Sequence, residues 1–168
     1  MATTTDAVPS YQIRIDKEGI WYYNGAVMFR KEIVNFFYQN LRRDNSGKYL
    51  IELENDHCYL DVEDTAYVIR SVRQTLSEME GEKVYQLLLS DDTQDILDPA
   101  TLRIGHENVL YCSVKNSRFE ARFLRPAYYQ LADDIEHDEV RNAYYIPLNG
   151  ERYYIANENI RQSHQREA

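Results

Sequence analysis

An internal repeat is the feature of this sequence that most restricts its fold. The residues around Phe29 recur around Leu124 at a constant shift of 95 residues (124 − 29), and no gap is needed. Each copy is predicted to contain a hairpin, a helix and a second hairpin, and two copies are expected to share a core. The matched positions are Ile33 with Tyr128, Val34 with Tyr129, Phe36 with Leu131, Leu53 with Leu148, Tyr59 with Tyr154, and residues 49–51 with 144–146.

Residues 29–64, the part of the first copy that follows its first hairpin, begin with a predicted amphipathic helix. Its apolar residues follow a helical period, which predicts that this stripe is the buried face. Arg42 and Arg43 are placed in its last turn, where cations meet the negative end of the helix dipole. Residues 45–47 are predicted to end the helix, with Gly47 at positive φ. The stripe consists of Phe29, Ile33, Phe36, Phe37 and Leu41.

Alternating and β-branched runs predict the strands, and turn dipeptides separate them. A first hairpin is expected over residues 13–23, and Asn24-Gly25 is a second turn signal. A second helix is predicted from Pro126 to about Ile135, and residues 91–99 and 133–142 are predicted as a loop and a charged turn. Further strands are expected at 49–53, 58–63, 66–72, 84–89 (central in its sheet), 102–104, 109–114, 119–123, 144–148 and 152–155.

These elements predict an α+β fold. It would consist of two repeated hairpin–helix–hairpin units with mostly antiparallel sheets, helices packed on the sheets, and a cleft between the lobes. The predicted organisation is a flexible leader (1–10), a first repeat (11–65), connecting strands with an acidic loop (66–105), a second repeat (106–156) and a polar tail (157–168).

Composition limits the classes of partner. The 168 residues carry a formal net charge of −9, which repels phosphate backbones and argues against nucleic acid as a general partner. No apolar run has the length of a membrane span, and the N-terminus lacks the pattern of a signal peptide. Cys58 and Cys112 stand outside any CxxC motif, and small buried thiols are expected. A cytoplasmic location is predicted.

Arg30 and Arg125 occupy equivalent places at the start of the two predicted helices. Unpaired backbone N–H groups at a helix start favour anions, and a guanidinium adds bidentate binding of carboxylate or phosphate. One hypothesis is therefore an anion-binding corner in one or both repeats. The alternative is that each arginine pairs with a nearby carboxylate and fixes the helix start.

Two further polar clusters have the same two interpretations. Arg42, Arg43 and Asp44 could contribute to a ligand site or could simply form a solvated helix end. Asp61 and Glu63, next to Asp64, could perform acid–base chemistry or hold a divalent cation, or could form a solvated strand face. No metal site is expected from the four scattered histidines, and no nucleotide or hydrolase motif occurs.

Several segments together carry a family resemblance. They are IRIDKEGIWYYNG, FRKEIVNFFYQNLRRDNSGKYLIEL, YLDVEDTAYVI and RPAYYQL, within about residues 11–155, and they resemble the bacterial domain-of-unknown-function family 1285. The resemblance implies an α+β fold of two repeated motifs and a ligand-binding or signalling role. The acidic segment DDTQDILDP and the tyrosine doublets depart from the family pattern, which puts a shared ligand in doubt. The matched positions are Arg30, Arg42, Arg43, Asp44, Tyr49, Asp61, Glu63, Asp64, Arg125, Pro126 and Tyr129.

The sequence thus predicts a binding or signalling module for a small anionic or polar ligand in the cleft between repeats. No cofactor is expected, and a non-catalytic role is favoured over an enzymatic one. Tyr128 joins the predicted ligand-binding residues. One alternative is a protein–protein interaction module, including a homodimer, that pairs through a strand edge or a tyrosine-rich surface. The other is an enzyme with Asp61, Glu63 or Asp64 as acid or base.

Overall fold

The computed structural model describes residues 11–159 and has a mixed α+β fold, built mostly from strands in largely antiparallel sheets. The described residues include two α-helices, α1 (Lys31–Gln39) and α2 (Arg125–Ala132). The chain divides into two compact units. Unit 1 comprises the chain up to Asp16 with Ile20–Glu63, and unit 2 comprises Lys17–Gly19 with the chain from Asp64 onward. The predicted leader and the end of the predicted tail lie outside the described residues.

Unit 1 contains two sheets. The first has the strand order β3-β2-β1-β7, in which β1 pairs antiparallel with β2 and parallel with β7. The second has the order β4-β5-β6. The predicted strand at 58–63 is therefore two strands, separated by the buried Leu60. The bounds are β1 (Ile13–Ile15), β2 (Trp21–Tyr23), β3 (Ala26–Val27), β4 (Leu41–Arg43), β5 (Tyr49–Leu53), β6 (Asp56–Tyr59) and β7 (Asp61–Val62).

Helix α1 is shorter than its apolar pattern predicts, and it buries a different residue. It ends at Gln39, and the predicted last turn is instead strand β4, because residues 41–43 pair with β5. The predicted buried stripe is wrong in part: Phe29 is 87% exposed and Phe36 is 48% exposed. Tyr38 is the buried residue of the helix, and its ring meets Trp21 edge to face with centroids 4.9 Å apart.

Unit 2 is built on a seven-stranded sheet with the order β10-β9-β8-β13-β12-β11-β17. Unit 2 also contains a three-stranded sheet with the order β14-β15-β16. Short 3₁₀ turns span Pro99–Thr101 and His106–Asn108. The bounds are β8 (Tyr67–Leu76), β9 (Lys83–Leu89), β10 (Gln94–Ile96), β11 (Arg103–Ile104), β12 (Leu110–Val114), β13 (Phe119–Phe123), β14 (Glu136–Asp138), β15 (Ala143–Leu148), β16 (Glu151–Tyr154) and β17 (Ala156–Asn157).

Three sequence predictions for unit 2 need correction. The acidic segment 91–99 contains strand β10, and the charged segment 133–142 contains strand β14, because each polar run pairs with a neighbouring apolar strand. Strand β9 lies next to the edge of its sheet rather than at the centre. Its residues alternate between buried and less buried, as expected for a strand with one covered face.

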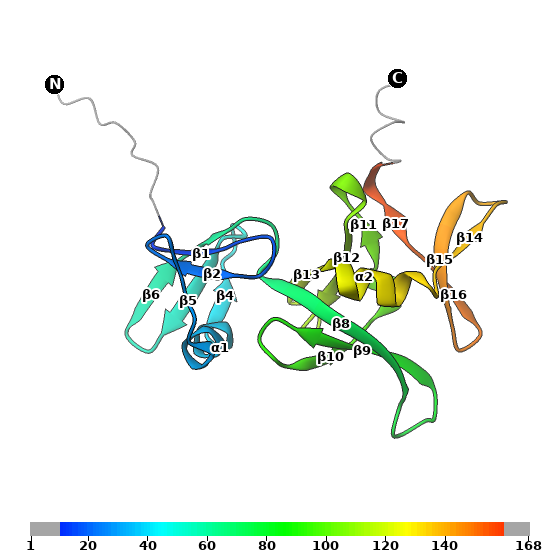
Figure 1. Ribbon diagram of the computed structural model, residues 1–168, viewed down its shortest axis with the longest axis horizontal. Helices are drawn as coiled ribbons and strands as arrows, with labels where there is room; N and C mark the ends of the chain where they lie inside the picture. The colour runs from blue at the N-terminus through cyan, green and yellow to red at the C-terminus, as the bar shows by residue number, and fades with distance from the viewer. Residues whose placement is uncertain (1–10, 160–168) are drawn as a thin grey trace, which may run out of the picture. The chain divides into compact units, whose positions relative to one another are not determined.

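Helix α2 lies across β8 and β13 (Figure 1). Ala127 and Leu131 face this sheet and are fully buried, and Gln130 accepts a hydrogen bond of 2.7 Å from the amide of Val72.

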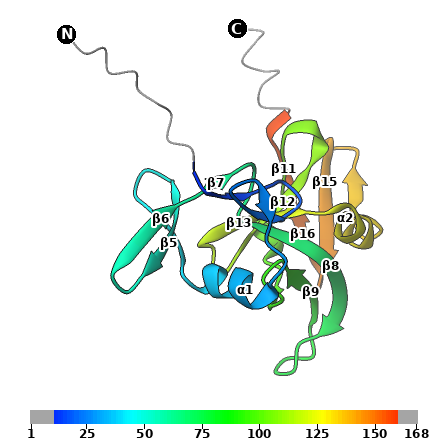
Figure 2. The same ribbon diagram turned by 60° about the vertical axis from the view of Figure 1, so that its left-hand side comes forward.

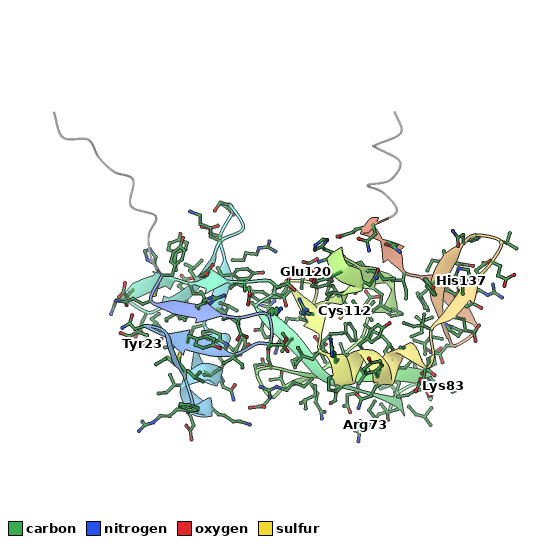
Figure 3. All side chains as sticks on the ribbon, turned by 45° about the horizontal axis from the view of Figure 1, so that its top comes forward. Tyr23, Arg73, Lys83, Cys112, Glu120 and His137 are labelled. Carbon is green, nitrogen blue, oxygen red and sulfur yellow. The ribbon has the colours of Figure 1, made fainter. Side chains whose placement is uncertain are left out.

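The two cysteines differ in burial. Cys112 is buried as predicted, on strand β12 next to strand β13, which carries Glu120 (Figure 3). Cys58 in unit 1 is half-buried. Burial raises the pKa of the Cys112 thiol, which makes it unreactive.

The two units share an order of strands. The sheet β3-β2-β1-β7 of unit 1 has the counterpart β13-β12-β11-β17 in unit 2, and β4-β5-β6 has the counterpart β14-β15-β16. Strands β8, β9 and β10 extend the sheet of unit 2 beyond β13. That the units are copies of one motif, and that a cleft lies between them, stay predictions.

Candidate functional site

A pocket of about 760 Å³ in unit 2, called here the charged pocket, is the candidate site. Strand β13 supplies Arg122 and leads directly into α2, which supplies Arg125. The 3₁₀ turn His106–Asn108 forms another part of the wall. The lining residues are Lys17, Glu18, Glu107, Asn108, Val109, Leu110, Arg122, Phe123, Leu124, Arg125, Pro126, Tyr128 and Tyr129, all within unit 2.

Arg122 is held by the protein itself. Its guanidinium donates to Asp64 at 2.9 Å, and the Tyr111 hydroxyl donates to the same carboxylate oxygen at 2.7 Å. Burial lowers the pKa of Arg122, but the hydrogen bond and charge of Asp64 outweigh that effect and raise the pKa overall. Arg122 therefore remains charged, and Asp64 balances its charge.

Arg125 differs from Arg122 in its surroundings. Within residues 11–159 its side chain makes no hydrogen bond or ion pair with the protein. The Tyr128 and Tyr129 hydroxyls likewise have no protein partner in that range, and their rings meet edge to face at 5.5 Å. One cation and two hydroxyl donors are thus available to a molecule in the pocket.

A second, smaller pocket of about 380 Å³ adjoins the first, and it is called here the neutral pocket. It is bounded by α2 and β15, which lie beside one another in Figure 2, together with β11 and β17. None of the described residues that line it is charged. Its residues are Ile104, Asn108, Leu110, Tyr128, Ala132, Ile135, Tyr144, Ile155 and Asn157, and Asn108, Leu110 and Tyr128 belong to both pockets.

Of the predicted ligand-binding residues, the structure brings Arg125, Tyr128 and Tyr129 together in the charged pocket. Arg30 lies in unit 1 at the residue before α1, and it lines neither pocket. The equivalence of Arg30 and Arg125 in sequence therefore does not extend to their surroundings.

Four other predicted residues meet in the β4–β5 hairpin of unit 1. Asp44 accepts hydrogen bonds from the Ser46 hydroxyl at 2.7 Å and the Lys48 amide at 2.9 Å, and these lower its pKa. The Arg43 side chain donates to the Gly47 carbonyl and lies over the Tyr49 ring, 5.3 Å from its centroid. Arg42 donates to the carbonyls of Gln39 and Leu41. These contacts stabilise the hairpin.

The carboxylates Asp61 and Glu63 flank one arginine. Arg14 on β1 lies 3.6 Å from a carboxylate oxygen of each, at the parallel pairing of β1 with β7. Both acids lie outside the two pockets, and Asp64 points instead into unit 2 towards Arg122. The single charge of Arg14 offsets part of the repulsion between the two carboxylates on a partly exposed surface.

The sequence reasoning missed Lys17, Glu18, Glu107 and Arg122 as pocket residues. A signal for Arg122 existed, because it occupies the polar position between the buried Ala121 and Phe123, three residues before Arg125. The others come from turns whose position depends on the fold.

Over residues 11–159, no group of three or more His, Cys, Asp or Glu side chains is placed to hold a metal ion. In the same range, no helix is long and apolar enough to cross a membrane.

Comparison with known proteins finds similarity to one family. Residues 5–65 match the model of the domain of unknown function DUF1285, N-terminal domain. A DUF1285 family protein from Silicibacter pomeroyi DSS-3 has the same fold, with a TM-score of 0.71 and 16% identity over 91% of this chain and 84% of that one. One from Shewanella baltica OS155 gives a TM-score of 0.59 and 16% identity over 73% and 91%. No curated protein matches the chain.

Proposed function

We propose that this chain, whose residues 5–65 match the N-terminal domain model of the DUF1285 family, is a non-catalytic binding or signalling module for a small anionic ligand. The proposed site is the charged pocket of unit 2. The observation that carries the proposal is the difference between its two arginines. Arg122 is paired with Asp64, whereas the Arg125 side chain has no partner among residues 11–159.

The chemistry of the pocket favours a ligand with a single carboxylate or a similar small anion. A guanidinium can bind a carboxylate through two parallel hydrogen bonds. The Tyr128 and Tyr129 hydroxyls are additional donors on the same wall. Glu18 and Glu107 also line the pocket, and their charges oppose the entry of a highly charged anion.

Binding is favoured over the catalytic alternative that uses Asp61, Glu63 or Asp64, because none of these three carboxylates is available in the charged pocket. Asp61 and Glu63 are close to Arg14 and outside both pockets. Asp64 already accepts hydrogen bonds from Arg122 and Tyr111. A general acid or base needs to reach the proton that it transfers, and these groups are occupied elsewhere.

The test is calorimetric titration of the full chain with acetate and with inorganic phosphate. The wild-type protein should bind one of these anions, and Arg125→Met should weaken that binding about tenfold or more, because a hydrogen bond to a charged group is lost. Arg30→Met is the matched control and should bind like the wild type, since Arg30 lines neither pocket. Equal losses in both variants, or no binding of either anion, would refute the proposal.

A second candidate function is protein–protein interaction through unit 1. Three large apolar side chains are exposed in and just before α1, namely Phe29 before the helix and Ile33 and Phe36 within it. Strand β3 is the outer strand of its sheet, so its second edge is open among the described strands. Light scattering over a range of concentrations tests this function: self-association that Phe36→Ser abolishes would support it, and a constant monomer mass would count against self-association.

A further inference from the structure

We propose that the ligand is amphipathic, with its carboxylate at Arg125 and a hydrocarbon segment in the neutral pocket. The inference rests on the proposed function and specifies the class of ligand. The two pockets share Asn108, Leu110 and Tyr128 as lining residues. Tyr128 therefore borders both spaces, and a molecule that passes its ring can occupy the charged pocket and the neutral pocket together.

One face of α2 borders both pockets. Its side chains are charged or polar at the start of the helix and apolar towards its end. Arg125 and Tyr128 line the charged pocket, and Tyr128, Ala132 and Ile135 line the neutral pocket. Arg125, Tyr128 and Ala132 are spaced by three and four residues, which keeps them on one side of α2, and Ile135 lies three residues after the helix ends. The rise of a helix places Ala132 about 10 Å beyond Arg125, a distance that a medium-length alkyl chain covers.

The neutral pocket offers little to a second polar group. Its asparagine oxygens are already used: Asn157 Oδ1 accepts from the Asn159 amide at 3.0 Å, and Asn108 Oδ1 accepts from Asn159 Nδ2 at 3.3 Å. The remaining wall is largely aliphatic, with Leu110 and Ile155 at its buried base. A dicarboxylate would place its second charge beside this wall, where a buried charge without a partner is unfavourable.

The experiment compares butyrate, octanoate and octanol by calorimetric titration of the full chain, below the concentration at which octanoate forms micelles. Octanoate should bind more tightly than butyrate, by up to about fourfold for each methylene group that becomes buried. Octanol should bind more weakly than octanoate, because it lacks the charge that Arg125 recognises. Arg125→Met should weaken both carboxylates by the same factor.

Two variants test the neutral pocket separately. Ala132→Phe fills the space, and Ile135→Asn keeps the space but makes its wall polar. Each should weaken octanoate binding by a larger factor than butyrate binding, so that the two affinities converge. Ala100→Phe is the matched control for added bulk, because Ala100 is an exposed residue of unit 2 that lines neither pocket.

The outcomes separate this inference from the proposed function. If butyrate binds through Arg125 but octanoate binds no more tightly, the amphipathic ligand is refuted and the anion site stands. Octanol binding as tightly as octanoate would refute the role of the carboxylate in both proposals. Unchanged octanoate affinity in Ala132→Phe and Ile135→Asn would overturn the use of the neutral pocket.

Discussion

Arg122 and Tyr111 donate hydrogen bonds to the same oxygen of Asp64, at 2.9 Å and 2.7 Å. Tyr111 lies on β12 and Arg122 lies on the adjacent strand β13. Both strands are therefore bonded to Asp64, the residue at which the main segment of unit 2 begins. Arg103 lies over the Tyr111 ring, with its guanidinium carbon 4.2 Å from the centroid. Tyr111 is thus enclosed by charged groups on a sheet that also supports the charged pocket.

The alkaline stability of the protein should depend on Tyr111. Burial, followed by the hydrogen bond to Asp64, raises its pKa from 10.0 to about 12. The unfolded chain releases this proton at the lower pH, so the stabilisation is complete below pH 10.0 and is lost as the pH rises to about 12. Tyr111→Phe should remove this part of the pH dependence, at most about 2 to 3 kcal/mol in the free energy of unfolding.

Urea unfolding at a series of pH values measures that difference between the wild type and Tyr111→Phe. Tyr129→Phe is the control, because Tyr129 is 64% exposed and has no hydrogen-bond partner for its hydroxyl within residues 11–159. Identical pH slopes for the wild type and Tyr111→Phe would show that Tyr111 titrates as it does in the unfolded chain.

Helix α1 should depend on Tyr38 rather than on its exposed apolar stripe. Tyr38→Ala removes the ring that packs against Trp21 and should lower the free energy of unfolding by about 3 to 5 kcal/mol. Phe29→Ser, at a residue that is 87% exposed, should change it by about 0.5 kcal/mol or less. Chemical denaturation of the two variants provides the comparison, and a large loss in Phe29→Ser would mean that the stripe is buried after all.

Two glycines with nearly equal φ should differ in their tolerance of a side chain. Gly19 and Gly25 have φ of +80° and +82°, so alanine costs about 1 kcal/mol or more at either position through backbone strain. A Cβ at Gly19 would lie 2.6 Å from Val68 Cγ2, whereas a Cβ at Gly25 would have no atom of residues 11–159 within 4 Å apart from those of its two chain neighbours. Gly19→Ala should therefore be the more destabilising by about 1 to 3 kcal/mol.

Thermal unfolding of these two variants tests the contact. The double variant Gly19→Ala/Val68→Ala should recover part of the loss, because it removes the methyl group that Cβ would meet. Equal melting temperatures for Gly19→Ala and Gly25→Ala would show that strain accounts for the whole effect.

The turns were predictable from sequence because their chemistry is local. Asn24-Gly25 and Asn149-Gly150 both have positive φ at each residue, the geometry of a tight hairpin turn that this dipeptide favours. Most strands also fall where alternating or β-branched residues predict them, as at β5, β8 and β13. In each case a few adjacent residues contain the information.

The end of α1 and the composition of the charged pocket needed the tertiary structure. Leu41, Arg42 and Arg43 fit the helical pattern, yet they form β4, because pairing with β5 satisfies their backbone groups and buries Leu41. Likewise, sequence selects Arg125 and Tyr128 by composition and position, but it gives no reason to join them to Asn108 or Leu110. Contacts between residues far apart in the chain decide that Arg122 is paired, with Asp64, and that Arg125 is available to a ligand.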